Sequence, residues 1–357
     1  MRKRILNIIG IGFLSVQVFA GNPDRGGQAS ATQLVVNGWA RSSGLGWSAQ
    51  SHIKGIESMY MNIAGLSATP KTDFIFSRTN WLSGSGVNIS NFGFAHNLGN
   101  DNTLGLTISS NDFGEIPITT VEQPDGGLGT FSPRFTNIGL GYGRKFTKHT
   151  TGGVLLRVFS ENASNVKMQG VAFDAGIQYQ TSWKNKDDIH FGVSIKNIGP
   201  DVKYTGDGIS IKMQNLINNQ EVTVIQRASK YNIPALINIG GAYDMYLDKT
   251  KETNFNKLTA AANFTYNAFS LNQLTFSAEY NYKNMFMIRG GFAYEKDILS
   301  STARRTATTG PMGGITFELP FGQSGNRFAL DYSYRHSNPF NGSHAIGIKM
   351  SLGGNEE

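Results

Sequence analysis

The chain has 357 residues, a formal net charge of +7, 43 glycines, 23 phenylalanines, 13 tyrosines and no cysteine. The lack of cysteine excludes a disulfide framework and any thiolate nucleophile or metal ligand. The lysines and arginines are scattered, with no run of five or more and no basic helix, so nucleic acid is not an expected partner.

Residues 1–20 have the pattern of an export signal. Basic residues at positions 2–4 precede an apolar stretch over residues 5–16, and residues 18–20 (VFA) fit a cleavage site. A signal anchor is the alternative, but the apolar stretch is short and contains Asn7. No later segment approaches the roughly 18 to 20 uninterrupted apolar residues of a membrane helix. The mature chain is therefore expected to be secreted, periplasmic or a β-barrel of an outer membrane.

The segment over residues 21–70 differs in composition from everything that follows it. Residues 21–33 are polar and glycine-rich, which is typical of a tether. Residues 34–70 are rich in alanine, serine and glycine, with Trp39, Trp47 and Tyr60 at roughly helical spacing, which predicts one or two short helices.

From residue 71 onward the apolar residues recur with a period of two, as in Leu104, Leu106 and Ile108. A strand turns successive side chains to opposite faces, so each segment has one apolar face and one polar face. Fourteen such segments lie between residues 71 and 352. The second changes phase between Ile89 and Phe92, which predicts a bulge near Asn91. Residues 353–357 are expected to be a short tail.

The connections between these segments alternate in length. The short set comprises 98–102, 147–150, 182–188, 247–256, 281–284 and 320–326, and the mostly longer set comprises 112–133, 161–168, 198–232, 295–308 and 336–342. Short turns at one end, long loops at the other and an even number of antiparallel strands are typical of an outer-membrane barrel. A soluble β-sandwich is the alternative. Fourteen strands of one alternation after an export signal favour the barrel, whose closure leaves no unpaired edge.

A fourteen-stranded barrel is too wide for its own side chains to fill. The polar face of the strands carries charges of both signs, which would line the lumen: Asp174, Lys196, Asp244, Glu279, Arg289, Glu318, Asp331, Arg335 and Lys349. These charges could line a weakly selective conducting pore or form a salt-bridged dock for a plug, and the mixed signs favour the dock. We expect residues 21–70 to supply that plug, because their tryptophans would otherwise have no place to be buried.

The sequence contains no established catalytic or metal-binding motif, neither HExxH nor a Gly-x-Ser-x-Gly elbow. A hydrolase site in the wall, with a serine near His336 or His344, is an alternative to the simpler interpretation of exposed histidines at the rim. Asp101, Asp112 and Asp125 lie in loops, as does Asp207, where acids could bind calcium but are usually solvated. We therefore predict no catalytic residue, no cofactor and no metal site.

Two of the long loops carry more apolar residues than free loops in water usually do. Ile116 and Ile118 lie in the first, and Ile211, Met213 and Leu216 in the second. These loops either fold over the barrel mouth or bind another protein.

Residues 38–66, and above all the stretch GIESMYMNIAGL over 55–66, resemble the hatch motif G-x-E-A-x-Y-x-N-P-A-G-L of the FadL-like barrel superfamily. The positions that match include Gly55, Glu57, Tyr60, Asn62, Gly65 and Leu66. The stretches at 22–27 (NPDRGG), 113–120 (FGEIPITT) and 170–176 (GVAFDAG) resemble the PorV/PorQ branch found in Bacteroidota. The chain departs from the pattern at Ile63, where the motif has proline, and at Leu352, where the last strand lacks a terminal aromatic residue.

This resemblance implies a non-enzymatic outer-membrane barrel of a Gram-negative bacterium, of the Bacteroidota, with both termini in the periplasm. The PorV/PorQ branch implies an accessory subunit of a type IX secretion complex or of an outer-membrane-protein assembly complex. Its partners would be outer-membrane lipid, a larger barrel and exported cargo protein. The alternative is a FadL-like channel that takes up hydrophobic small molecules through the hatch and a lateral wall opening. The inward apolar residues Leu155, Phe159, Met285 and Met287 give no continuous apolar path, which favours the subunit.

Overall fold

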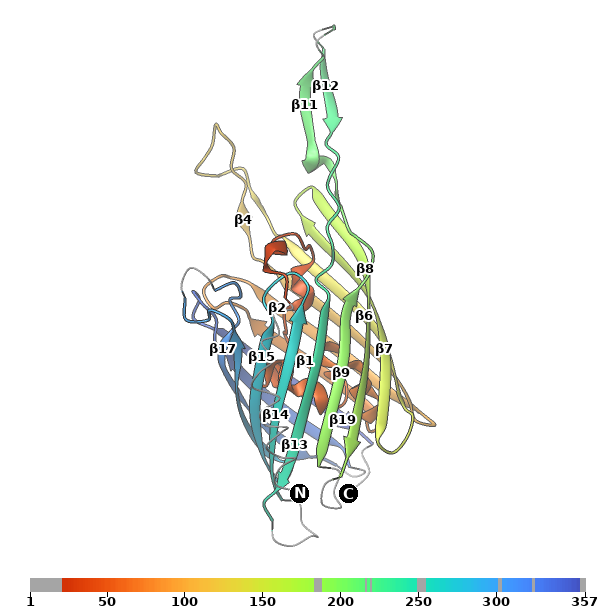
Figure 1. The fold of residues 1–357 in the computed structure, drawn as a ribbon. Helices are drawn as coiled ribbons and strands as arrows, with labels where there is room; N and C mark the ends of the chain where they lie inside the picture. The colour runs from red at the N-terminus through yellow and green to blue at the C-terminus, as the bar shows by residue number, and fades with distance from the viewer. Residues whose placement is uncertain are drawn as a thin grey trace.

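The computed structural model describes residues 21–182, 188–215, 217–218, 220–248, 255–300, 304–322 and 325–353; the expected export signal lies outside this part of the chain. Fourteen strands of the described residues form a closed antiparallel barrel (Figure 1), which confirms the predicted fold. Closure is made by the first and last barrel strands, where Thr72 pairs with Leu352. The barrel therefore begins and ends at the same rim, the one with the shorter turns.

Each barrel strand pairs with the barrel strands before and after it along the chain, and the last strand pairs with the first. The strands are β1 (Thr72–Asn80), β2 (Asn88–Gly99), β3 (Asn102–Asp112), β6 (Arg134–Lys145), β7 (Thr150–Ala163), β8 (Val166–Thr181), β9 (Ile189–Ile198), β13 (Leu236–Tyr246), β14 (Asn256–Asn267), β15 (Gln273–Tyr282), β16 (Phe286–Glu295), β17 (Gly310–Pro320), β18 (Arg327–Arg335) and β19 (Ser343–Leu352).

The outer face of the barrel is apolar and the inner face is polar or small. Leu140, Phe173 and Ile346 are each more than half exposed on the outside, although they are large hydrophobic residues. Their inward neighbours along the strands are glycine, alanine, serine or charged residues. This inversion of a soluble core is expected of strands whose outer face touches lipid. No helix in the described part of the chain has the length and apolar character needed to cross a membrane.

The bulge expected near Asn91 is absent. Strand β2 keeps its register through this point, with Ile89 opposite Thr79 and Asn91 opposite Ser77, and its irregularity lies between Asn97 and Gly99. Ile89 and Asn91 both face inward. The phase change predicted from the sequence was wrong because Ile89 is an apolar residue that faces the plug rather than the lipid, and it packs against Gly38.

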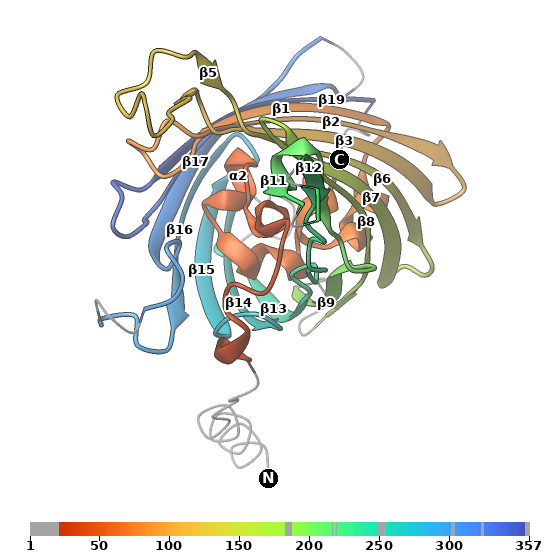
Figure 2. The same ribbon diagram turned by 90° about the horizontal axis from the view of Figure 1, so that it is seen from above.

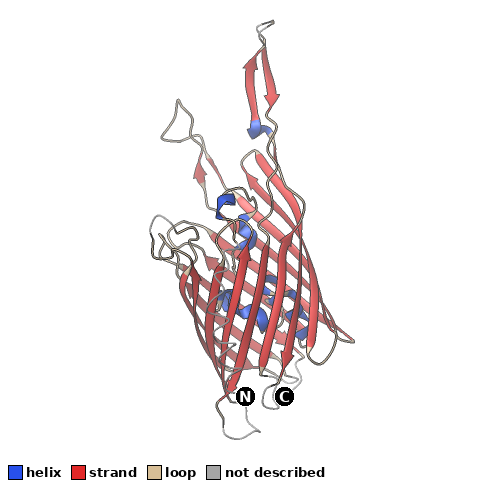
Figure 3. Cartoon of the chain, in the orientation of Figure 1, coloured by secondary structure: helices blue, strands red, loops and turns tan. Residues whose placement is uncertain are grey.

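The N-terminal segment folds into several one-turn helices rather than the one or two expected, and those from α2 to η4 lie inside the barrel (Figures 2 and 3). Glycines account for the difference, because Gly46 (φ +58°), at the start of η3, and Gly55 (φ +75°), between η3 and α3, adopt left-handed conformations that a continuous helix does not contain. The helices are η1 (Pro23–Arg25), η2 (Thr32–Val35), α2 (Ala40–Ser43), η3 (Gly46–Ser51), α3 (Ser58–Met61) and η4 (Ile63–Ala68). We call residues 34–68 the plug.

The longer loops form projections above the opposite rim (Figure 1). The first carries β4 (Ile116–Pro117) and β5 (Thr130–Phe131); the second carries β10 (Tyr204–Thr205), η5 (Asp207–Ile209), β11 (Ser210–Gln214) and β12 (Glu221–Ile225). The connection expected over 161–168 is instead a two-residue turn, because β7 and β8 continue their pairing to Ala163 and Val166.

Candidate functional site

The hatch motif forms a closed loop inside the plug. The backbone N–H of Gly55 donates to the carbonyl oxygen of Gly65 at 2.9 Å. Gly55 has a positive φ, and a Cβ there would lie 2.5 Å from Oδ2 of Asp73. A Cβ on Gly65 would collide with the carbonyl of Ile53. Both glycines are therefore required by close approach, and at Gly55 also by backbone conformation.

Asn62 joins this loop to the wall. Its Oδ1 accepts the N–H of Ala64 at 3.2 Å and so caps η4. Its Nδ2 donates to the carbonyl oxygens of Ile177 on β8 at 3.2 Å and Val193 on β9 at 3.4 Å. Ile63, which replaces the proline of the motif, is buried in the plug core. The turn at this point forms without proline because the Asn62 side chain supplies the cap.

Glycines of the wall make room for the apolar side of the hatch. A Cβ on Gly105 of β3 would lie 2.5 Å from the sulfur of Met59, and one on Gly143 of β6 would lie 3.0 Å from Cβ of Leu66. Leu66 is fully buried in the same apolar cluster as Tyr60, whose ring stacks on Trp47 at 5.5 Å between centroids. The plug thus packs directly against the backbone of these strands.

Both carboxylate oxygens of Glu57 are buried without a hydrogen bond among the described residues, as are the hydroxyls of Ser58 and Tyr60. Burial raises the pKa of Glu57 from its ordinary 4.5 to about 7, and the nearby carboxylate of Asp331 adds to the rise. Arg41, Lys349 and Arg289 oppose it. Glu57 can therefore exchange a proton near neutral pH while the plug is docked.

The expected lumen charges lie on the inward face of the wall, and several pair around the plug. Arg289 contacts Glu279 at 2.9 Å and Asp331 at 3.8 Å, and it donates to the carbonyl oxygen of Arg41 in α2 at 3.3 Å. The guanidinium of Arg41 in turn binds Glu279 at 3.2 Å. This network is a salt-bridged dock between α2 and strands β15, β16 and β18.

A second network holds α3. Arg157 of β7 binds Asp174 of β8 at 2.8 Å and donates to the carbonyl oxygen of Met59 at 2.9 Å. Lys196 of β9 binds Asp174 at 3.3 Å and donates to the carbonyl oxygen of Tyr60. Its ammonium also lies 4.7 Å from the centre of the Tyr60 ring. Two buried cations therefore stabilise α3 through the backbone carbonyls of Met59 and Tyr60.

The remaining lumen charges are paired elsewhere in the barrel. Asp244 binds His190 at 3.1 Å and Lys257 at 3.2 Å, and it accepts a hydrogen bond from Thr259 at 2.5 Å. The other three pairs are Lys349 with Asp73 at 3.2 Å, Arg335 with the carbonyl oxygen of Thr308 at 2.9 Å, and Glu318 with Arg327. Each of these groups has a fixed partner, as expected of a structural lumen rather than an open polar pore.

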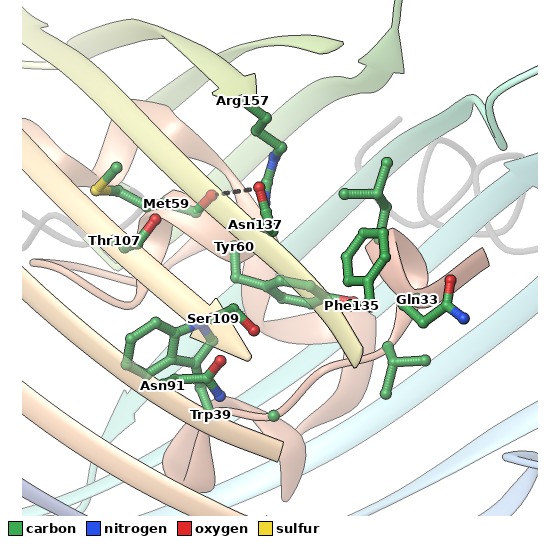
Figure 4. Close-up of a pocket in the computed structure, with 13 residues that line it drawn as sticks. Gln33, Trp39, Met59, Tyr60, Asn91, Thr107, Ser109, Phe135, Asn137 and Arg157 are labelled. Atoms are coloured by element: carbon green, nitrogen blue, oxygen red, sulfur yellow. Dashed lines mark hydrogen bonds between the residues drawn. The ribbon is translucent and has the colours of Figure 1, made fainter. Parts of the chain in front are cut away.

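A small cavity lies between the plug and the wall. It has a volume of about 20 Å³ and lies next to strands β2, β3, β6 and β7, with Trp39, Tyr60, Asn137 and Arg157 among its lining residues (Figure 4). This volume has room for about one water molecule. The cavity is too small to pass an organic solute.

A larger hollow lies beside strand β8 of the wall. The pairing of β8 with β9 is irregular between Phe173 and Ala175 and stops at Ile198, so the next part of β8 has no strand beside it until β10 pairs with Met168. Next to this gap is a notch of about 410 Å³. It is lined by Val158, Phe159, Ser160, Gln169, Gly170, Val171, Pro200, Asp201 and Val202. We call this gap and notch the seam.

The seam reaches an apolar cluster under the barrel mouth. Phe159 and Val202 line the notch and are also buried in this cluster, while Val158 faces outward and is half exposed. The other members of the cluster are Ala31, Leu34, Phe135, Met168, Ala172 and Ile233. Of the inward apolar residues considered from the sequence, Leu155 and Met287 are buried, whereas Met285 lies in a turn and is partly exposed.

The loop residues expected to bind partners are exposed. Ile116 and Ile118 lie at β4, and Ile211 and Met213 lie on β11 opposite Val224 and Val222 of β12. These four residues of the β11–β12 hairpin share one face and make it wholly apolar. Leu216 lies outside the described residues.

The acids and histidines of the described residues form no group of three or more that could hold a metal ion. His344 hydrogen-bonds to Tyr332 at 2.8 Å, and His52 and His190 face each other inside the barrel rather than at its rim. Arg157 is a lumen residue that was not predicted from the sequence. Its position between Leu155 and Phe159, both of which face inward, is the signal that would have placed it in the lumen.

No family model and no curated protein match the chain. Solved structures with a similar fold include the CymD monoaromatic hydrocarbon channel, with a TM-score of 0.52 and 12% identity over 89% of this chain and 100% of that one. The toluene transporter TodX of Pseudomonas putida gives a TM-score of 0.51 and 12% identity over 88% of this chain and 97% of that one. At this identity the likeness shows the fold alone, a closed barrel like those of these outer-membrane channels.

Proposed function

We propose that this protein is a channel for small hydrophobic molecules in the outer membrane of a Gram-negative bacterium. The observation that carries the proposal is the seam, which joins the apolar cluster under the mouth to the outer face of the wall. Its volume of about 410 Å³ lies within the range of small-molecule sites, whereas the cavity beside the plug holds about one water. The proteins of similar fold named as hydrocarbon channels support the same class of cargo.

The proposed route avoids the bore. A hydrophobic molecule enters between the long loops, passes the cluster around Phe135 and Phe159, and leaves through the seam toward lipid. Val158 and Phe173 on the outer wall are half exposed and continue the apolar surface beyond the notch. The plug and its ion pairs keep the lower bore closed to ions and polar solutes, so the chain transports by partition into the membrane and has no enzymatic role. In this arrangement the short turns and both termini face the periplasm.

Filling the notch from outside tests this function. Val171 faces outward beside the gap, and Val171→Trp would occupy the notch without touching the plug. Ile177→Trp is the matched control, because Ile177 also faces outward on β8 but is paired with Val193 on the intact ladder. We expect uptake of radiolabelled toluene by expressing cells to fall at least fivefold in Val171→Trp and to remain unchanged in Ile177→Trp. Equal uptake by both variants would refute the route.

A second candidate is an accessory subunit of a type IX secretion or outer-membrane-protein assembly complex, as in the PorV/PorQ family of Bacteroidota. The β11–β12 hairpin favours it, because Ile211, Met213, Val222 and Val224 give one face of a two-stranded ribbon that is apolar and exposed. A ribbon of two strands is marginal in water without a further layer. A larger barrel or an exported cargo protein would be that layer, with outer-membrane lipid around the wall.

The subunit hypothesis is tested by purification in mild detergent. Replacing Ile211, Met213, Val222 and Val224 with threonine should release a stoichiometric partner that co-purifies with the unaltered chain. The matched control replaces Lys212 and Thr223 on the opposite face of the same hairpin with serine. Purification of the unaltered chain as a lone monomer would contradict this second candidate and leave the channel.

A further inference from the structure

The seam and the plug meet at one side chain, Asp174. This residue sits at the irregularity of β8, between Phe173 and Ala175, where the register with β9 shifts. Its Oδ1 accepts the backbone N–H of Asn197 at 2.7 Å. Asn197 has a left-handed backbone (φ +58°) and lies in the bulge of β9 opposite Asp174, one residue before the last pair, Phe173 with Ile198. The carboxylate therefore provides the hydrogen bond that the regular ladder does not supply at this point.

The other oxygen of the same carboxylate is bound by the cations that hold the plug. Oδ2 accepts both Nε and Nη2 of Arg157, at 2.9 and 2.8 Å, and Nζ of Lys196 at 3.3 Å. Those two cations also donate to the carbonyl oxygens of Met59 and Tyr60 in the hatch helix. Arg157, Asp174 and Lys196 are all nearly fully buried, so their contacts are not screened by water.

We propose that Asp174 is a positioning residue that couples the plug to the seam. The inference rests on the proposed function, and it adds the means by which the wall opening is regulated. When α3 is displaced, Arg157 and Lys196 lose their carbonyl acceptors and must reorient on Asp174, which loosens the Asn197 hydrogen bond and frees the bend in β9. When α3 is docked, the same contacts hold the bend in place. The state of the hatch is thereby transmitted to the lateral opening over a chain of four hydrogen-bonded residues.

The chain lacks cysteine, so single thiols can report on each region. Ser58→Cys is a nearly isosteric reporter in the plug, where Ser58 is fully buried, and Val202→Cys is a reporter at the seam. We expect Asp174→Asn to raise the maleimide labelling rate tenfold or more at both reporters. The asparagine can still accept from Asn197, so a purely local role in the bend leaves Ser58→Cys unchanged and refutes the coupling. A rise at the plug alone, or at neither reporter, refutes it as well.

Asp244→Asn is the matched control. Asp244 is equally buried and equally paired, but its described side-chain partners, His190, Lys257 and Thr259, are all in the wall. It should leave both labelling rates within twofold. If Asp174→Asn does not give a folded, heat-modifiable barrel, Lys196→Gln is the second variant, because it removes one of the two cations that join Asp174 to the plug. It should raise both labelling rates by a smaller factor. A rise at only one reporter would refute the coupling. Maleimide labelling requires no substrate, so its result does not depend on the outcome of the toluene uptake assay. The uptake result likewise does not depend on the labelling.

Discussion

The plug is held by two unlike surfaces of one barrel. Toward β3 and β6 it packs against glycines, with Met59 and Leu66 lying on bare backbone. Toward β15, β16 and β18 it is held by ion pairs around Arg289. On the first side shape fixes the plug, and on the second side charge does. A displaced plug can return to the same position only if both conditions are met.

The two sides of the plug tolerate different changes. Close packing against backbone has no flexible group that can give way, so any added side chain must move the plug. An ion-pair network can tolerate shifts of a few tenths of an ångström, but loss of one partner leaves a buried charge uncompensated. The predictions below perturb one side at a time and use Ser58→Cys labelling to measure plug release.

The largest effect is expected on the charged side. Arg289→Met removes the cation shared by Glu279 and Asp331, and the side chain of Arg289 is fully buried. Breaking a buried pair in this way costs about 3–5 kcal/mol. We expect labelling of Ser58→Cys to accelerate by two orders of magnitude or more. Arg289→Lys keeps the charge but not the planar guanidinium, so its labelling rate should lie between those of the unaltered chain and Arg289→Met. An unchanged rate in Arg289→Met would show that charge does not hold the plug.

A smaller effect is expected on the packed side. A Cβ at Gly143 would lie 2.8 Å from the backbone nitrogen of Ser67 and 3.0 Å from Leu66. Overpacking of this kind costs about 1–3 kcal/mol. Gly143→Val should therefore raise the labelling rate by roughly ten- to a hundredfold. Gly290→Val is the control, because a Cβ there has no neighbour nearer than 4.0 Å; equal rates in the two variants would contradict the role of close approach.

The two sides also differ in how far the sequence revealed them. The period of two from residue 71 onward predicted the barrel, because lipid outside and polar groups inside impose strict alternation. The same alternation assigned the charged residues of the dock to one face, but it could not say that Arg41 of the plug would join Glu279 and Arg289, since their pairing depends on how the plug lies. The wall glycines at 105 and 143 are explained only by the plug that packs against them.

The seam was beyond reach of the sequence for a different reason. It depends on where β9 stops and on the return of the chain at β10, and both follow from pairing between distant segments. Ile89 misled the analysis in the same way, because an apolar residue can face a plug as well as lipid. A periodic pattern assigns a side chain to one face of a strand, but it does not identify what covers that face.

The smallest effect, measured per pH unit, is expected from the titration of Glu57, which lies on the charged side of the plug. Its pKa is raised to about 7 in the docked plug, and in a released plug it returns toward 4.5. The contribution of Glu57 to the free energy of docking is therefore fully present below pH 4.5. It weakens between pH 4.5 and pH 7, because Glu57 ionises at a lower pH in the released plug than in the docked plug. Above pH 7 the contribution no longer changes. Labelling of Ser58→Cys should rise with pH over this window by no more than about tenfold per pH unit. The control is the ratio of the Ser58→Cys labelling rate with Glu57 to the rate with Glu57→Gln, because the ionisation of the thiol affects both rates equally. A ratio that is constant from pH 5 to 8 would show that Glu57 contributes nothing to the free energy of docking.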